Sequence, residues 1–154
     1  MGSWFRIFFR LENLTERTIT INKRYKNKSA NVRIVGAIQN PQNMRRTPLD
    51  FECRIDTGFD GGILVPHWYR SDAQTIGVEP SITNITLADG SKIPAYVCAA
   101  YIHKIDTYTF PPPGKTAILV MCGNRKRELL GMDALKHCSV LFDGPKQTFT
   151  ISFG

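Results

Sequence analysis

The segment Asp56-Thr57-Gly58 holds the residues of this 154-residue sequence that are best suited to acid–base chemistry. Its carboxylate follows an apolar run ending at Ile55, its threonine hydroxyl can donate and accept hydrogen bonds, and its glycine lets the backbone approach a ligand closely. A lone carboxylate among apolar residues is costly. A second carboxylate that shares a proton with it would relieve that cost, and such a pair can activate a water molecule. The segment therefore predicts chemistry by paired carboxylates on a bound water.

Short strands and turns must position this segment. Leu49, Phe51, Cys53 and Ile55 alternate with polar residues, which predicts a strand with one buried face that runs straight into Asp56. An Asp-Gly pair at 89–90 lies between two strand-like runs and predicts a hairpin. Further strands are expected at 18–21, 32–38, 63–65, 82–87, 93–102, 117–121, 140–142 and 148–153, with a helical turn at 67–76 and a short helix at 132–137. The fold class expected is all-β, a closed barrel with one short C-terminal helix.

Three blocks in this order resemble the retropepsin-like aspartic peptidases, the clan that includes pepsins and retroviral proteases. The segment Asp56-Thr57-Gly58-Phe59-Asp60-Gly61 is similar to the D-T-G-F variant of small prokaryotic members. Leu87-Ala88-Asp89-Gly90-Ser91 resembles their flap hairpin, and Leu129-Leu130-Gly131-Met132-Asp133-Ala134-Leu135 resembles their second signature. The resemblance implies a retropepsin-like domain at 31–154, preceded by a basic extension of unknown role at 1–30.

The resemblance also implies an aspartic endopeptidase that works as a homodimer, because a chain with one such motif is too short for the two lobes of a pepsin. Asp56 from each chain would be catalytic, and Thr57 and Gly58 would support the active-site loop. Strand 148–153 is the expected subunit interface. The peptide substrate would lie against Phe59, Asp60, Ala88, Asp89, Gly90 and Ser91, while Gly131 and Asp133 belong to the structural signature. No metal or other cofactor is implied.

Two residues depart from the retropepsin pattern and leave the substrate open. Phe59 stands where many retropepsins have alanine, so its ring would narrow or fill a side-chain pocket. Met132 stands where retroviral members often carry arginine. An alternative function is therefore a retropepsin-fold module that dimerises or binds peptides without cutting them.

The net charge of +7 is concentrated near the N-terminus, where residues 1–46 hold ten of the twenty Lys and Arg against two acidic residues. Residues 4–14 have apolar side chains at helical spacing, and a basic amphipathic arm can meet a membrane surface or nucleic acid. The favoured interpretation is that these basic residues form a solvent-exposed face without a specific partner, and no motif supports nucleic-acid binding.

The cysteine and histidine positions suggest neither disulfides nor a metal site. None of the four cysteines (Cys53, Cys98, Cys122 and Cys138) forms a C-x-x-C pair. His67, His103 and His137 lack metal-ligand spacing. The sequence therefore indicates a reduced, cytoplasmic protein.

Overall fold

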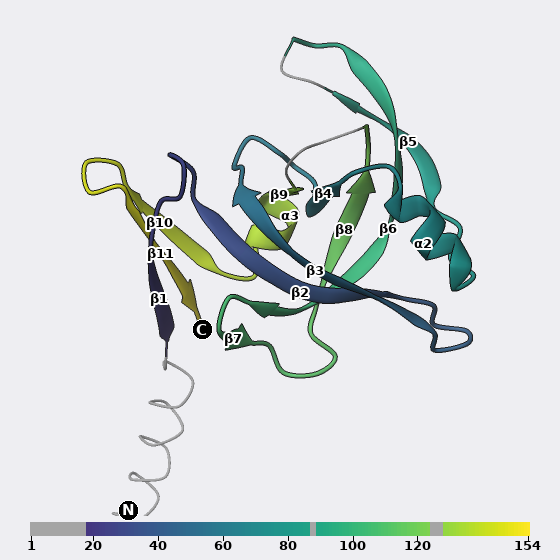
Figure 1. Cartoon of the computed structure of the whole chain (residues 1–154), viewed down its shortest axis with the longest axis horizontal. Coiled ribbons are helices and arrows are strands. Elements are labelled where there is room, and N and C mark those ends of the chain that lie inside the picture. The colour runs from purple at the N-terminus through teal and green to yellow at the C-terminus, as the bar shows by residue number, and fades with distance from the viewer. Residues whose placement is uncertain (1–17, 87–88, 124–127) are drawn as a thin grey trace, which may run out of the picture.

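The computed structural model describes residues 18–86, 89–123 and 128–154, which form two β-sheets and two short helices (Figure 1). The expected amphipathic segment 4–14 lies outside the described residues. The elements are β1 (Ile19–Arg24), β2 (Asn31–Gln39), β3 (Arg46–Ile55), β4 (Ile63–Val65), α2 (Tyr69–Thr75), β5 (Ser81–Thr86), β6 (Lys92–Ile105), β7 (Tyr108–Thr109), β8 (Lys115–Met121), β9 (Glu128–Leu130), α3 (Met132–Leu135), β10 (Ser139–Asp143) and β11 (Thr148–Phe153). Neither helix in these ranges is long and apolar enough to cross a bilayer.

The larger sheet closes into a six-stranded barrel, so the predicted all-β barrel is confirmed. Its strands pair in the order β2-β3-β9-β4-β8-β6, and β2 also pairs with β6. The alternation predicted for β3 is also confirmed, since Leu49, Cys53 and Ile55 are buried in the main core and Phe51 packs against it. The strand β5 extends the sheet beyond the barrel, and β6 is the one strand in the described ranges that pairs with it.

The smaller sheet has the order β1-β11-β10, with β11 in the centre. Phe149, Ile151 and Phe153 of β11 are at most 2% exposed and belong to the main core of this chain. The ring of Phe153 stacks on Tyr108 at 4.1 Å, which joins this sheet to the barrel. β1 and β10 occupy both edges of β11, and its apolar face is buried within this chain. The alternation is therefore explained without a second copy, and the subunit interface expected at β11 stays a prediction.

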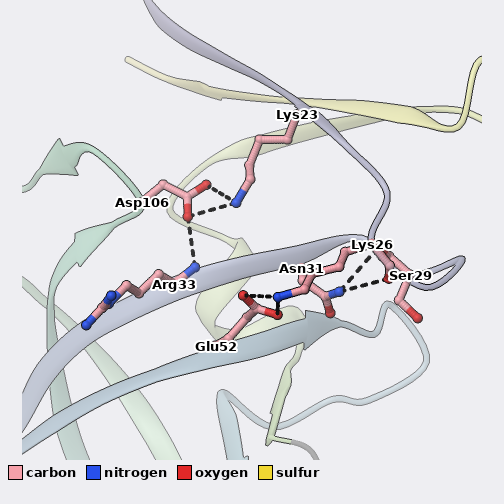
Figure 2. Close-up of polar contacts among 7 residues, drawn as sticks. All are labelled: Lys23, Lys26, Ser29, Asn31, Arg33, Glu52 and Asp106. Carbon is pink, nitrogen blue, oxygen red and sulfur yellow. Dashed lines mark hydrogen bonds and ion pairs between the residues drawn. The ribbon is translucent and has the colours of Figure 1, made fainter.

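The strand β1 belongs to the segment 1–30, which the sequence predicts to be an extension. Charged and polar contacts join it to the barrel (Figure 2). Lys23 Nζ lies 2.8 Å from Asp106 Oδ2 and donates to Oδ1 at 3.0 Å. Asp106 Oδ1 also accepts the backbone N–H of Arg33, on β2, at 2.8 Å. The Asp106 side chain is only 10% exposed, so it is a largely buried acceptor between β1 and the barrel. A second pair, Lys26 with Glu52, is longer at 3.4 Å and open to solvent.

Asp106→Ala is expected to lower the free energy of unfolding by about 2 kcal/mol, because it leaves a partly buried ammonium and a backbone N–H without their charged acceptor. Urea unfolding measures the change. Glu52→Ala is the matched control, and its expected cost is below about 0.5 kcal/mol because Glu52 and its partner Lys26 are both exposed. Equal losses in the two variants would contradict this role for Asp106.

Candidate active site

Asp56 follows the last residue of β3, in a turn closed by backbone hydrogen bonds. Its N–H donates to the carbonyl of Leu130 on β9 at 2.9 Å, and its carbonyl accepts the N–H of Phe59 at 3.2 Å. The side-chain Oδ1 accepts the N–H of Gly58 at 3.0 Å. Thr57 and Gly58 are exposed, and the Asp56 side chain is half-buried. Among the described residues no ion pair engages this carboxylate, so it is oriented by Gly58 and open to a further partner.

The second signature supports the Asp56 loop through three successive backbone donors. The N–H groups of Gly131, Met132 and Asp133 donate to the carbonyls of Gly62 (2.8 Å), Phe59 (2.8 Å) and Gly61 (3.1 Å). The parallel pairing of β3 with β9 brings the two segments together. Two blocks of sequence about seventy residues apart therefore form one rigid backbone unit.

The ring of Phe59 folds back on this unit. A Cβ atom added to Gly131 would overlap the Gly61 carbonyl oxygen and the ring and carbonyl of Phe59. A Cβ on Gly61 would also meet the Phe59 ring. The two glycines thus make the space that the ring occupies. Asp60, next in the loop, is exposed.

Asp133 joins this unit to the barrel strand β8. Its Oδ2 accepts the N–H of Ile118 at 2.8 Å, and its Oδ1 accepts Lys136 Nζ at 2.9 Å. Burial alone would raise the pKa of Asp133, but the hydrogen bonds from Ile118 and Lys136 outweigh it and hold the pKa below its ordinary value. The ionised carboxylate is therefore the form that fastens α3 to β8.

Because the pKa of Asp133 is lower in the folded chain, its ionised form stabilises the fold above its unfolded pKa, and that stability is lost as the pH falls through the folded pKa. The wild-type chain should therefore lose more stability than Asp133→Asn when the pH falls below about 4. Urea unfolding at a series of pH values measures this, with Asp72→Asn on the exposed face of α2 as the control. Parallel pH profiles for the wild-type chain and Asp133→Asn would contradict this assignment.

A second apolar cluster lies outside the barrel and connects the Asp56 loop to the β5–β6 hairpin. Its buried members are Leu64, Ala95, Val120, Cys122 and Leu129, and Phe59, Ile85, Ile93 and Val97 pack around them half-buried. Neighbouring residues in the same strands face the main core instead, as Ile63 and Leu119 do. Our interpretation of the sequence missed this cluster. The sequence could have predicted it, because residues 63–65 and 119–121 are apolar at every position. A continuous apolar run of this kind indicates a strand that is buried on both faces.

The predicted hairpin is confirmed between β5 and β6 and projects from the barrel (Figure 1). Gly90 has a φ of +85°, a conformation that favours glycine. Asp89 Oδ1 accepts the N–H of Ser91 at 2.9 Å and its hydroxyl at 2.6 Å, which lowers the pKa of Asp89. These polar contacts stay within the tip. Ala88 lies outside the described residues.

Other reactive side chains are dispersed or protonated. His67 and His137 each contact a backbone carbonyl, of Gly123 and Thr116 respectively, while His103 contacts Arg46. Burial raises the pKa of the Cys98 and Cys138 thiols to about 11, which keeps them protonated near neutral pH. Within the described residues no group of three or more His, Cys, Asp or Glu side chains is placed to hold a metal ion.

Comparison with protein-family models, curated proteins and solved structures finds no match for this chain. The likeness to retropepsins therefore remains a prediction from the three sequence blocks, beside an all-β barrel that the structure establishes.

Proposed function

We propose that this chain is an aspartic endopeptidase whose active form is a homodimer. The observation that carries the proposal is the Asp56 loop, in which a half-buried, oriented carboxylate stands on a backbone unit held by Gly131, Met132 and Asp133. A fixed acid–base group without an ion-pair partner among the described residues fits one half of a carboxylate pair. A second copy of the chain would supply the other Asp56.

In the proposed reaction the two Asp56 carboxyl groups share one proton and hold one water. The ionised carboxylate takes a proton from the water, whose oxygen attacks the scissile carbonyl carbon, while the other carboxyl group donates its proton to the carbonyl oxygen. The resulting gem-diol breaks its C–N bond as the carboxyl group that took the water's proton donates it to the leaving amine, while the other, now ionised, carboxylate takes a proton from a gem-diol hydroxyl. This step releases the acid and the amine and restores the single shared proton. Two carboxylates this close do not both ionise readily, so the pair titrates as a unit.

The second apolar cluster supports a peptide as the substrate. Its half-buried members, Phe59 from the loop and Ile85 and Ile93 from the hairpin, offer apolar surface next to the Asp56 unit. A peptide side chain placed there would bury apolar area on both sides.

The four free cysteines fit a cytoplasmic location.

The edge strand β10 is the surface that best fits the second copy. It pairs only with β11 among the described strands, and its Leu141 and Phe142 are 72% and 41% exposed. It follows α3 after a short connection, and α3 holds the Asp56 loop. Pairing of two β10 edges about a two-fold axis would cover these side chains.

Leu141→Lys is expected to raise the dissociation constant of the dimer by at least about tenfold, because a charge would enter the centre of the paired edge. Sedimentation velocity measures the dimer, and cleavage should fall with it. Met44→Lys is the control, since Met44 is 65% exposed in the turn between β2 and β3. If the Leu141→Lys chain assembles and also cleaves as well as the wild-type chain, β10 is not the interface that forms the active site.

The proposed activity is tested by incubating the purified chain with an unfolded protein, such as reduced and alkylated lactalbumin, over a range of pH. Cleavage that a pepstatin-like inhibitor blocks is expected. A chain that dimerises and binds the inhibitor without cutting would instead be the non-proteolytic peptide-binding module. If the chain neither cleaves the protein nor binds the inhibitor, both functions are rejected.

A further inference from the structure

The strand β5 has a free edge and is the most continuously exposed strand described. Among the described strands it pairs with β6 alone, and its residues are exposed except for Ile85. Ile82 is 69% exposed, close to the highest value for a large apolar side chain among the described residues. A free edge presents unpaired backbone donors and acceptors in a row.

The register with β6 shows which residues present those groups. Asn84 lies opposite Pro94, which has no backbone N–H to donate. The Pro94 carbonyl accepts the thiol of Cys122 at 3.7 Å, so it faces β8 rather than β5. Asn84 and Pro94 are therefore a non-hydrogen-bonded pair, and the N–H and C=O of Asn84 point to the free edge. Because the pattern alternates along the strand, the backbone N–H and C=O of Ile82 and Thr86 also point to the free edge. Those of Thr83 and Ile85 form hydrogen bonds with β6.

Nothing in the sequence of this strand protects the edge. The stretch Ser81-Ile82-Thr83-Asn84-Ile85-Thr86 has no charged residue, no proline and no glycine, and four of its six side chains are β-branched. Natural edge strands usually carry lysine, proline or a bulge that prevents pairing with another chain. The edge strand β1, by contrast, carries Lys23 and Arg24.

We propose that the free edge of β5 pairs antiparallel with β5 of a second copy, centred on Asn84. In this register Asn84 faces Asn84 of the second copy, Ile82 faces Thr86, and Thr83 faces Ile85. The backbone N–H and C=O groups of Ile82, Asn84 and Thr86, which point to the free edge, then lie opposite the same groups of the second copy. No like charges lie opposite each other. The contact is isologous and joins two hairpins into one four-stranded ribbon. It uses neither Asp56 nor β10, so it stands independently of the proposed function.

Amide hydrogen exchange at low and high protein concentration tests this pairing residue by residue. The amides of Ile82, Asn84 and Thr86 should slow by about tenfold once roughly nine-tenths of the chains are paired. The amides of Thr83 and Ile85, already bonded to β6, serve as internal controls and should not change.

Two substitutions at one position separate backbone pairing from side-chain contact. Asn84→Pro removes the outward N–H without removing a hydrogen bond to β6, and it should abolish the concentration-dependent protection of Ile82 and Thr86. Asn84→Ala also loses the asparagine side chain but keeps the N–H, and it should retain the protection. Ile82→Lys should abolish the protection by placing a charge on the edge. Exchange rates independent of concentration in the wild-type chain, or protection retained in Asn84→Pro, would overturn the proposal.

Discussion

Asp56→Asn is expected to lower kcat for peptide hydrolysis by on the order of 10³-fold or more, because an amide can neither take the proton of the water nor share a proton with the second Asp56. The fold should survive. The amide oxygen of asparagine can still accept the N–H of Gly58, and the position is half-buried rather than in the core. We therefore expect a loss of less than about 1 kcal/mol in the free energy of unfolding.

Cleavage rates and urea unfolding of the same preparation measure both halves of this expectation. Asp72→Asn, an exposed carboxylate on α2, is the matched control and should cut at the wild-type rate. Full activity in Asp56→Asn would remove Asp56 from the chemistry. A variant that loses activity and fold together would show that Asp56 is structural, a result that the geometry of its loop does not predict.

Gly131→Ala is expected to cost about 3 kcal/mol or more of stability, and with it the activity, although it adds one methyl group. The new Cβ would overlap the carbonyl oxygens of Gly61 and Phe59 as well as the Phe59 ring. Backbone oxygens cannot rotate away as a flexible side chain can, so the loop or α3 must move. Either movement disturbs the hydrogen bonds that orient Asp56.

Gly144→Ala in the turn between β10 and β11 is the matched control, since no atom lies within 4 Å of a Cβ added there. Its stability should stay within about 0.5 kcal/mol of the wild-type chain. A double variant, Gly131→Ala with Phe59→Ala, removes the ring but leaves both carbonyl overlaps. We expect only partial rescue, and full rescue would show that the ring alone sets the requirement for glycine.

The local elements of the site could be predicted from the sequence because each carries its own signal. Strict alternation gave the buried face of β3, and the Asp-Gly pair gave the hairpin. The Asp56 and Gly131 segments could be named individually. Their mutual hydrogen bonds could not, since they depend on the parallel pairing of β3 with β9, which no local pattern encodes.

The burial of β11 within its own chain could not be predicted for a related reason. Alternation of Phe149, Ile151 and Phe153 shows that one face is buried, but it does not say what buries it. The answer came from distant partners, such as Tyr108 stacked on Phe153. The contact of Lys23 with Asp106 likewise joins residues 83 positions apart, and nothing in either neighbourhood indicates the other.

Subunit mixing tests most directly whether two copies of Asp56 make one active site. Wild-type chain is mixed with increasing amounts of Asp56→Asn chain at fixed total concentration, subunits are allowed to exchange, and the cleavage rate is measured. If each site needs both carboxylates, activity falls as the square of the wild-type fraction, to about one quarter in an equal mixture of freely exchanging homodimers. A linear fall, to about one half, would show that each chain cuts alone and would contradict a shared site.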